Sequence, residues 1–323
     1  MKFVRRRPVA RRLSRFAVGG AAVIAVLTAA SCSTSGTAAS TTGSSTAAAG
    51  GKTIQVVAAE NFWGSIASQL GGSHVKVTSI INNPDADPHA YEPTAADART
   101  VAGAQYTIVN GIGYDAWADK LLAANPADGR TDLKVGDLVG IKPGGNPHRW
   151  YSPDDVHKVI DKITSDYKAL DPGDAAAFDK LKTTFETDGL GEYNRLISAI
   201  KTKYAGTPIG ASESIVTPLA DGLGLKMVTP DSFLSAISEG ADPTAKDKSA
   251  IDQQIAGKQL KIYVYNSQNA TPDVQAQVKA AKAKGIPVAT VTETPTPAGV
   301  SFQAWQVRQL QGIEQALAKA TGK

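Results

Sequence analysis

Cysteine is almost absent from this chain: one residue, Cys32, occurs among 323. A single cysteine excludes a disulfide framework within the chain and argues against iron–sulfur clusters and copper(I), which prefer thiolate ligands. Histidine is scarce as well, with four residues. The apolar run at residues 16–30 falls short of the ~20 residues that a membrane-spanning helix needs. A metal site in this chain would therefore depend on imidazole and carboxylate.

The first 31 residues carry much of the positive charge. They contain seven basic residues and no acidic one, and without them 27 basic residues stand against 30 acidic ones, a net charge of −3. We therefore expect no nucleic acid partner. A basic start, an apolar run and small residues before Cys32 are typical of an export signal. The lone cysteine at its end resembles a bacterial lipobox, in which Cys32 would be the lipid attachment residue. A plain cleaved signal with an incidental cysteine is the alternative.

Residues 33–51 consist of Ser, Thr, Ala and Gly alone. Such a segment buries too little apolar surface to offset the entropy of ordering it, which predicts a flexible tether. A tether behind a lipid anchor would hold a soluble domain at the outer face of the cytoplasmic membrane.

The chain from residue 54 onward alternates short apolar strands with amphipathic helices, which predicts an α/β fold with mainly parallel sheets. The expected strands are residues 54–58, 75–81, 106–110, 207–211, 226–229, 260–266 and 287–292, with residues 133–141 returning toward the sheet. The expected helices are residues 62–70, 95–102, 115–124, 214–222, 245–257, 271–284 and 302–320, and one that starts at residue 152 or 153.

Residues 174–204 show helical periodicity without a strand, although Gly189 and Gly191 interrupt it. We expect one long helix here, linking two α/β lobes, and the cleft between the lobes is the default binding site. The expected divisions are a signal peptide (1–31), a tether (32–52), an N-terminal lobe (53–172), the linking helix (173–206) and a C-terminal lobe (207–323).

Four side chains follow apolar segments of this pattern. His89 and His148 each come after a proline in a loop, and Glu213 and Glu293 come directly after the expected strands 207–211 and 287–292. The carboxyl ends of parallel strands are where ligands bind in open α/β sheets. Two imidazoles from one lobe would face two carboxylates from the other, which is a ligand set for one divalent first-row metal ion.

Each of these residues also has an ordinary structural interpretation. A loop histidine is more often hydrogen-bonded or solvated than metal-bound. The negative charge of Glu213 at a helix start would interact favourably with the helix dipole, and Glu293 could be an ordinary surface acid. We expect the other two histidines, His74 and His157, to be structural. They serve as controls for the metal-site hypothesis.

Taken together, several motifs resemble the zinc/manganese-type solute-binding lipoproteins of bacterial ABC importers. They are DPHAYEPT, NPHRWYSP, SES before LADGLGL, SEGADPT, and TETPTPAGVSFQAW before the last helix. The resemblance covers residues 53–321 and implies two α/β lobes around one buried metal ion. It implies ligands at His89, His148 and Glu213, and a carboxylate at Glu293, where the family commonly has Asp. It also implies a membrane ABC permease as partner and a monomeric, non-enzymatic protein.

Alternative functions remain open at this point. An anchored metallohydrolase would use His89, His148 and Glu213 as ligands, with Glu293 as general base on a bound water. A serine hydrolase would use Ser212 or Ser214, but no G-x-S-x-G elbow surrounds either. An adhesive surface protein is a further class. Four protein ligands would close a tetrahedral site, which favours metal capture over catalysis.

The sequence does not decide whether the metal is zinc or manganese. Two carboxylates with two imidazoles form a hard ligand set, which favours manganese or iron(II), and no His-rich loop separates the two histidines. Zinc nevertheless exceeds manganese in intrinsic affinity and accepts carboxylate oxygen beside histidine. We expect zinc to bind at least as tightly as manganese.

Overall fold

The computed structural model describes residues 53–323. The expected signal peptide, the tether and Cys32 lie outside the described residues. None of the helices in this part of the chain is long and apolar enough to cross a membrane.

The described residues form two four-stranded sheets in which every neighbouring pair of strands is parallel, so the predicted α/β fold class is confirmed. The first sheet has the order β2-β1-β3-β4, with β1 Ile54–Glu60, β2 Val75–Ile81, β3 Tyr106–Val109 and β4 Thr131–Lys134. The second has the order β6-β5-β7-β8, with β5 Pro208–Ala211, β6 Lys226–Met227, β7 Ile262–Asn266 and β8 Val288–Val291.

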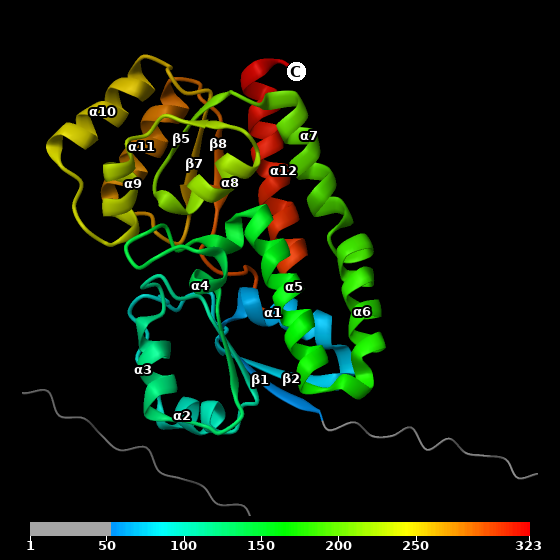
Figure 1. Cartoon of the computed structure of the whole chain (residues 1–323). Coiled ribbons are helices and arrows are strands. Elements are labelled where there is room, and N and C mark those ends of the chain that lie inside the picture. Colours follow the sequence, from blue (N-terminus) through cyan, green and yellow to red (C-terminus); the bar gives the residue numbers. More distant parts are fainter. Residues whose placement is uncertain (1–52) are drawn as a thin grey trace, which may run out of the picture. The chain divides into compact units, whose positions relative to one another are not determined.

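Helices connect these strands. They are α1 Asn61–Gly71, α2 Ala95–Ala102, α3 Ala116–Ala124, α4 Val135–Val139, α5 Pro153–Leu170, α6 Ala175–Thr184, α7 Gly191–Tyr204, α8 Thr217–Gly222, α9 Asp231–Ser238, α10 Ala245–Ala256, α11 Pro272–Ala283 and α12 Phe302–Thr321. We call the first sheet with α1–α5 the N-terminal lobe and the second with α8–α12 the C-terminal lobe. Figure 1 shows the two sheets one above the other.

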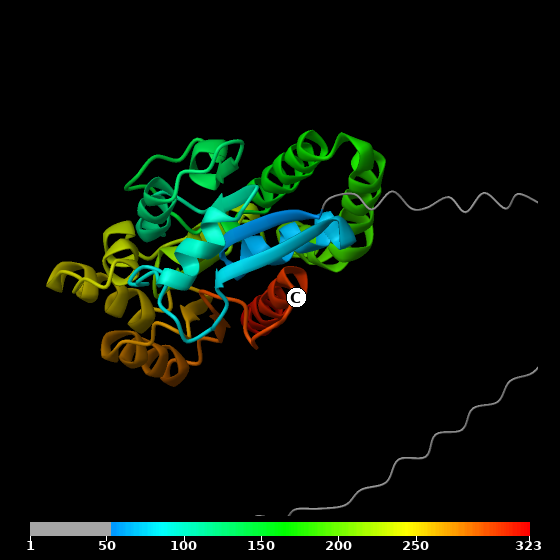
Figure 2. The same ribbon diagram turned by 90° about the horizontal axis from the view of Figure 1, so that it is seen from below.

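Strand β1 is buried on both faces because it lies in the middle of its sheet. Val56 and Ala58 join the large core formed with α1 and α5, whereas Val57 and Ala59 face a smaller core under α2 and α3. Helices therefore cover both faces of the sheet, as a parallel sheet requires. In the view from below (Figure 2) the green helices α5 and α6 lie side by side, next to the blue strands of this sheet.

The segment between the lobes is helical, but it is not one continuous α-helix. A π-helical turn at Phe185–Gly189 separates α6 from α7, at the point where the glycines interrupt the pattern. Figure 1 shows α6 and α7 in succession along one side of both sheets. The exact domain boundaries remain a prediction.

The lobes also meet directly, at the start of α12. Ser65 Oγ of α1 accepts a hydrogen bond from the Phe302 backbone N–H at 2.9 Å. Gln69 and Gln303 exchange amide hydrogen bonds at 3.1 and 2.6 Å. This junction and the linking helices join the lobes, and the carboxyl ends of the strands meet between them.

Two local features go beyond the sequence-based expectations. The segment 133–141 contains only the end of β4, because the chain turns into the short helix α4 at Val135. Helix α9 was not expected at all, although it buries Phe233, Leu234 and Ile237 against the C-terminal lobe.

Candidate metal centre

His89 lies in the loop between β2 and α2. Its backbone N–H donates to the side chain of Asp87 at 2.9 Å, which shapes the turn around Pro88. The imidazole packs edge-on against the ring of Tyr114, with the ring centroids 4.6 Å apart, and its side chain is 36% exposed. Burial is the main cause that lowers the pKa of His89 below its ordinary value, while the charge of Glu293 opposes that shift. The ring is therefore neutral at pH 7, which is the form that binds metals.

His148 is buried, and its orientation is fixed from one side. Asn146 Oδ1 lies 2.9 Å from His148 Nδ1 and also accepts the His148 backbone N–H at 3.0 Å. Because that oxygen can only accept, Nδ1 carries the proton and Nε2 keeps a free lone pair. Histidines that bind a metal commonly donate the other ring N–H in this way, which leaves Nε2 of His148 as the available ligand atom.

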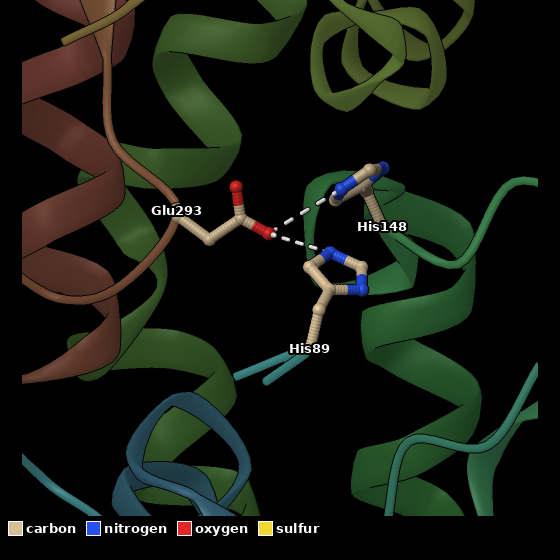
Figure 3. Close-up of side chains that lie close together, drawn as sticks. All are labelled: His89, His148 and Glu293. Atoms are coloured by element: carbon tan, nitrogen blue, oxygen red, sulfur yellow. Dashed lines mark ion pairs between the residues drawn. The ribbon is translucent and has the colours of Figure 1, made fainter. Parts of the chain in front are cut away.

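Glu293 follows β8 and reaches across from the C-terminal lobe to both histidines (Figure 3). Its Oε1 lies 3.4 Å from His148 Nε2 and 3.8 Å from His89 Nε2. The three ligand atoms lie within 4.8 Å of one another. Two donors bonded to one tetrahedral zinc at about 2.0–2.1 Å lie ~3.3 Å apart, so this spacing approaches that of a metal site.

Two further side chains hold the Glu293 carboxylate. The phenol of Tyr114 donates to Oε1 at 3.1 Å, and Asn266 Nδ2 donates to Oε2 at 3.0 Å. Burial opposes ionisation of Glu293, but the neighbouring His148, His89 and Tyr114 outweigh it and lower the pKa below the ordinary value. The carboxylate is therefore charged at neutral pH and faces two imidazoles.

Glu213 is close to this group but not part of it. It follows β5 and is buried, and its Oε2 accepts a hydrogen bond from Asn269 Nδ2 at 2.8 Å. Its Oε1 has no hydrogen-bond partner among the described residues. Burial, followed by the charge of Glu293, raises the pKa of Glu213 to about 8. An unsatisfied buried carboxyl oxygen is costly, and a cation within reach would relieve that cost.

Two cavities open onto this group. One of about 500 Å³ is lined by His148, Tyr114 and Glu239, and one of about 760 Å³ by Asp85, Asp87 and Glu239; both also touch His89. No Lys or Arg lines either cavity within the described residues. The approach to the histidines is thus acidic, which suits a cation.

The structure thus brings together three of the four residues expected at the site. Glu293 is in direct range of both imidazoles, whereas Glu213 stands outside the group. The control histidines lie elsewhere: His74 Nδ1 is 2.7 Å from Asp174 Oδ2, and His157 is on α5. Sequence reasoning missed Tyr114 and Asn266, although Asn266 ends the expected strand 260–266 and Tyr114 directly precedes the expected helix 115–124.

Two neutral imidazoles and a carboxylate suit a divalent first-row transition metal, and none of the three is a thiolate. The nitrogen of each imidazole that faces Glu293 is Nε2. The donors come from both lobes, so one ion bound here would tie the lobes together.

The family and the relatives that this chain matches are consistent with a metal site of this kind. A family model described as "Zinc-uptake complex component A periplasmic" matches residues 56–316. The zinc-binding lipoprotein AdcA of Streptococcus pneumoniae is 24% identical over 278 residues, which is 76% of this chain and 52% of AdcA. The manganese-binding lipoprotein MntA of Halalkalibacterium halodurans is 27% identical over 133 residues, 40% of this chain and 43% of MntA. The chain thus spans about half the length of these two curated relatives.

A solved structure has the same fold. It is the manganese-bound S38A mutant of a periplasmic metal-binding protein from Candidatus Liberibacter asiaticus. The TM-score is 0.69 at 21% identity, over 82% of this chain and 99% of that protein.

Proposed function

The chain belongs to the family of periplasmic A components of zinc-uptake complexes, and we propose that it captures one divalent metal ion, zinc or manganese, outside the cytoplasm. It then delivers the ion to a membrane ABC permease. The ion is cargo rather than a catalytic cofactor. The family is one of metal-uptake components, so the enzyme alternatives are set aside.

The observation that carries this proposal is the convergence of His89, His148 and Glu293 from two lobes. Each presents an atom with a free lone pair to the same small space, and the approach to it is acidic. Neutral imidazole with carboxylate is a set that zinc and manganese both accept.

We propose Glu213 as the fourth ligand. Its unpartnered Oε1 supports this assignment, because the buried oxygen gains a partner only if a cation or a proton reaches it. A small shift of its side chain toward Glu293 would bring a second carboxylate onto the ion. Four protein donors leave no open position for a reacting water, which suits capture and release.

We further propose that Cys32 carries a lipid anchor and that residues 33–51 tether the lobes to the outer face of the membrane. The relatives AdcA and MntA are lipoproteins, which supports this placement. Metal binding stabilises the conformation in which both lobes hold the ion, by mass action. A permease that recognises that conformation would accept loaded protein in preference to empty protein.

Titration calorimetry of the metal-free full chain with zinc and with manganese tests the proposal. We expect one ion per chain, and His89→Ala or His148→Ala should weaken binding by orders of magnitude because each removes a ligand. His74→Ala and His157→Ala are matched controls and should bind as the wild type does. Equal losses in a control and in a site variant would show that the wrong histidines have been assigned.

A further inference from the structure

A further contact between the lobes lies next to the candidate metal centre. Tyr151 of the N-terminal lobe follows His148 by three residues and is fully buried. Its hydroxyl lies 2.8 Å from the Thr292 carbonyl oxygen and 2.6 Å from Gln309 Oε1. Thr292 and Gln309 both belong to the C-terminal lobe, and Thr292 immediately precedes Glu293.

Thr292 is held on every polar atom. Its N–H donates to Gln309 Oε1 at 2.7 Å, and its carbonyl faces Tyr151. Its Oγ1 accepts from Trp305 Nε1 at 2.8 Å and donates to the Thr294 carbonyl at 2.9 Å. The backbone that precedes Glu293 is therefore fixed, and among these bonds of Thr292 only the one with Tyr151 comes from the other lobe.

The direction of these bonds is determined by Thr292. Its N–H needs an acceptor, so the amide oxygen of Gln309 must point toward it. The Gln309 oxygen and the Thr292 carbonyl are then both acceptors, so the Tyr151 hydroxyl is the donor and its single proton is shared between them. A buried phenol and a buried amide thus form one connected network across the lobe boundary, and such networks specify a geometry more strongly than isolated bonds do.

Aromatic packing stiffens the same connection on the His148 side. The ring centroids of His148 and Trp150 lie 5.3 Å apart. The ring centroid of Tyr151 lies 6.3 Å from that of Trp150 and 5.7 Å from that of Trp305. Contacts therefore run without a gap from the His148 imidazole to α12. Tyr114 holds the Glu293 carboxylate itself, whereas Tyr151 holds the backbone that carries it.

Resting on the metal-binding function proposed above, we propose that Tyr151 is a positioning residue that sets the spacing of His148 and Glu293 and so favours zinc over manganese. Zinc binds in a compact tetrahedral shell, whereas manganese suits a larger octahedral shell that includes water. Selectivity among such ions depends on geometry as well as on ligand type, and the ligand set here accepts both ions. A fixed, short span between the lobes excludes the larger shell, and a loosened span admits it.

Tyr151→Phe removes the bond and keeps the ring. Competition titrations of the metal-free full chain should show zinc affinity about tenfold weaker and manganese affinity changed much less, so that the zinc-to-manganese affinity ratio falls about tenfold. Tyr167→Phe is the matched control. Tyr167 is also a buried phenol, but it donates to the Ala67 carbonyl at 3.1 Å within its own lobe, so the ratio should not change.

An unchanged ratio in Tyr151→Phe, or equal losses for both ions, would overturn the proposal. If that variant does not fold, Gln309→Met tests the network from the other lobe and should lower the ratio as well; an unchanged ratio there overturns the proposal equally. If both fold, the double variant should lose less than the sum of the single losses, because the residues share one network. Wild-type protein that binds neither ion would instead contradict the proposed function.

Discussion

Replacement of Glu213 by glutamine gives a quantitative test of its role as a ligand. Burial and the charge of Glu293 raise the pKa of Glu213 to about 8, so its carboxyl is about 90% protonated at pH 7. A carboxyl must lose its proton to bind a metal ion. Metal binding at pH 7 should therefore release about 0.9 proton from Glu213, at a cost of about 1.4 kcal/mol.

The pH dependence follows from the same value. Below pH 8, each fall of one pH unit should lower the metal affinity by up to about tenfold, because more of the Glu213 carboxyl is protonated. Above pH 8 the carboxyl is already ionised, so the affinity should rise about tenfold from pH 7 to pH 9. His89 does not add to this rise, because its pKa lies below the ordinary value and its ring is already neutral at pH 7. In Glu213→Gln the rise should vanish, and zinc should bind more weakly because an amide carries no charge.

Zinc calorimetry in two buffers with different enthalpies of ionisation measures the released protons directly. Stability gives an independent check on the metal-free protein. Because the folded-state pKa of Glu213 is raised, its favourable contribution to folding is fully present below pH 4.5 and is lost as pH rises through about 8. The free energy of unfolding in urea should therefore fall less between pH 5 and pH 8.5 in the Glu213→Gln variant than in the wild type. Identical proton release and affinity in the two proteins would refute the assignment.

Three further predictions concern other parts of the chain. Burial, with the nearby Asp115, raises the pKa of Glu60, so its contribution to stability is lost as pH rises; Glu60→Gln should reduce the decline in urea stability from pH 5 to pH 8, and an unchanged decline would contradict this. Tyr114→Phe removes the donor to Glu293 Oε1 and should weaken zinc binding about tenfold in calorimetry without unfolding the protein; unchanged affinity would remove its role. Cys32→Ala should release the chain from the membrane fraction, and retention would argue against the anchor.

Much of the fold could be predicted from the sequence because hydrophobic periodicity is local. Buried strands such as β1 and β7 read as short apolar runs, and Ser152 with Pro153 marks the start of α5. The short helix α9 was missed although Phe233, Leu234 and Ile237 have helical spacing. Its eight residues are too few for periodicity to stand out from the surrounding loops.

The candidate site was predictable in part for the same reason. The Pro-His pairs and the position of Glu293 after a strand placed three side chains at the carboxyl ends of the sheets. The distances between these side chains depend on how the two lobes pack against each other, and a local sequence pattern does not determine that packing. The orientation of Glu213 and the bonds from Tyr114 and Tyr151 depend on contacts between residues more than 50 positions apart.

X-ray absorption at the zinc edge of the zinc-loaded full chain measures the number and type of donors around the ion. We expect a closed shell of four donors at about 2.0–2.2 Å, with the multiple-scattering signature of two imidazoles and the remainder carboxylate oxygen. Replacing both His89 and His148 by alanine should abolish the imidazole signature. A six-coordinate shell of oxygens, or a spectrum that the double replacement leaves unchanged, would contradict this expectation.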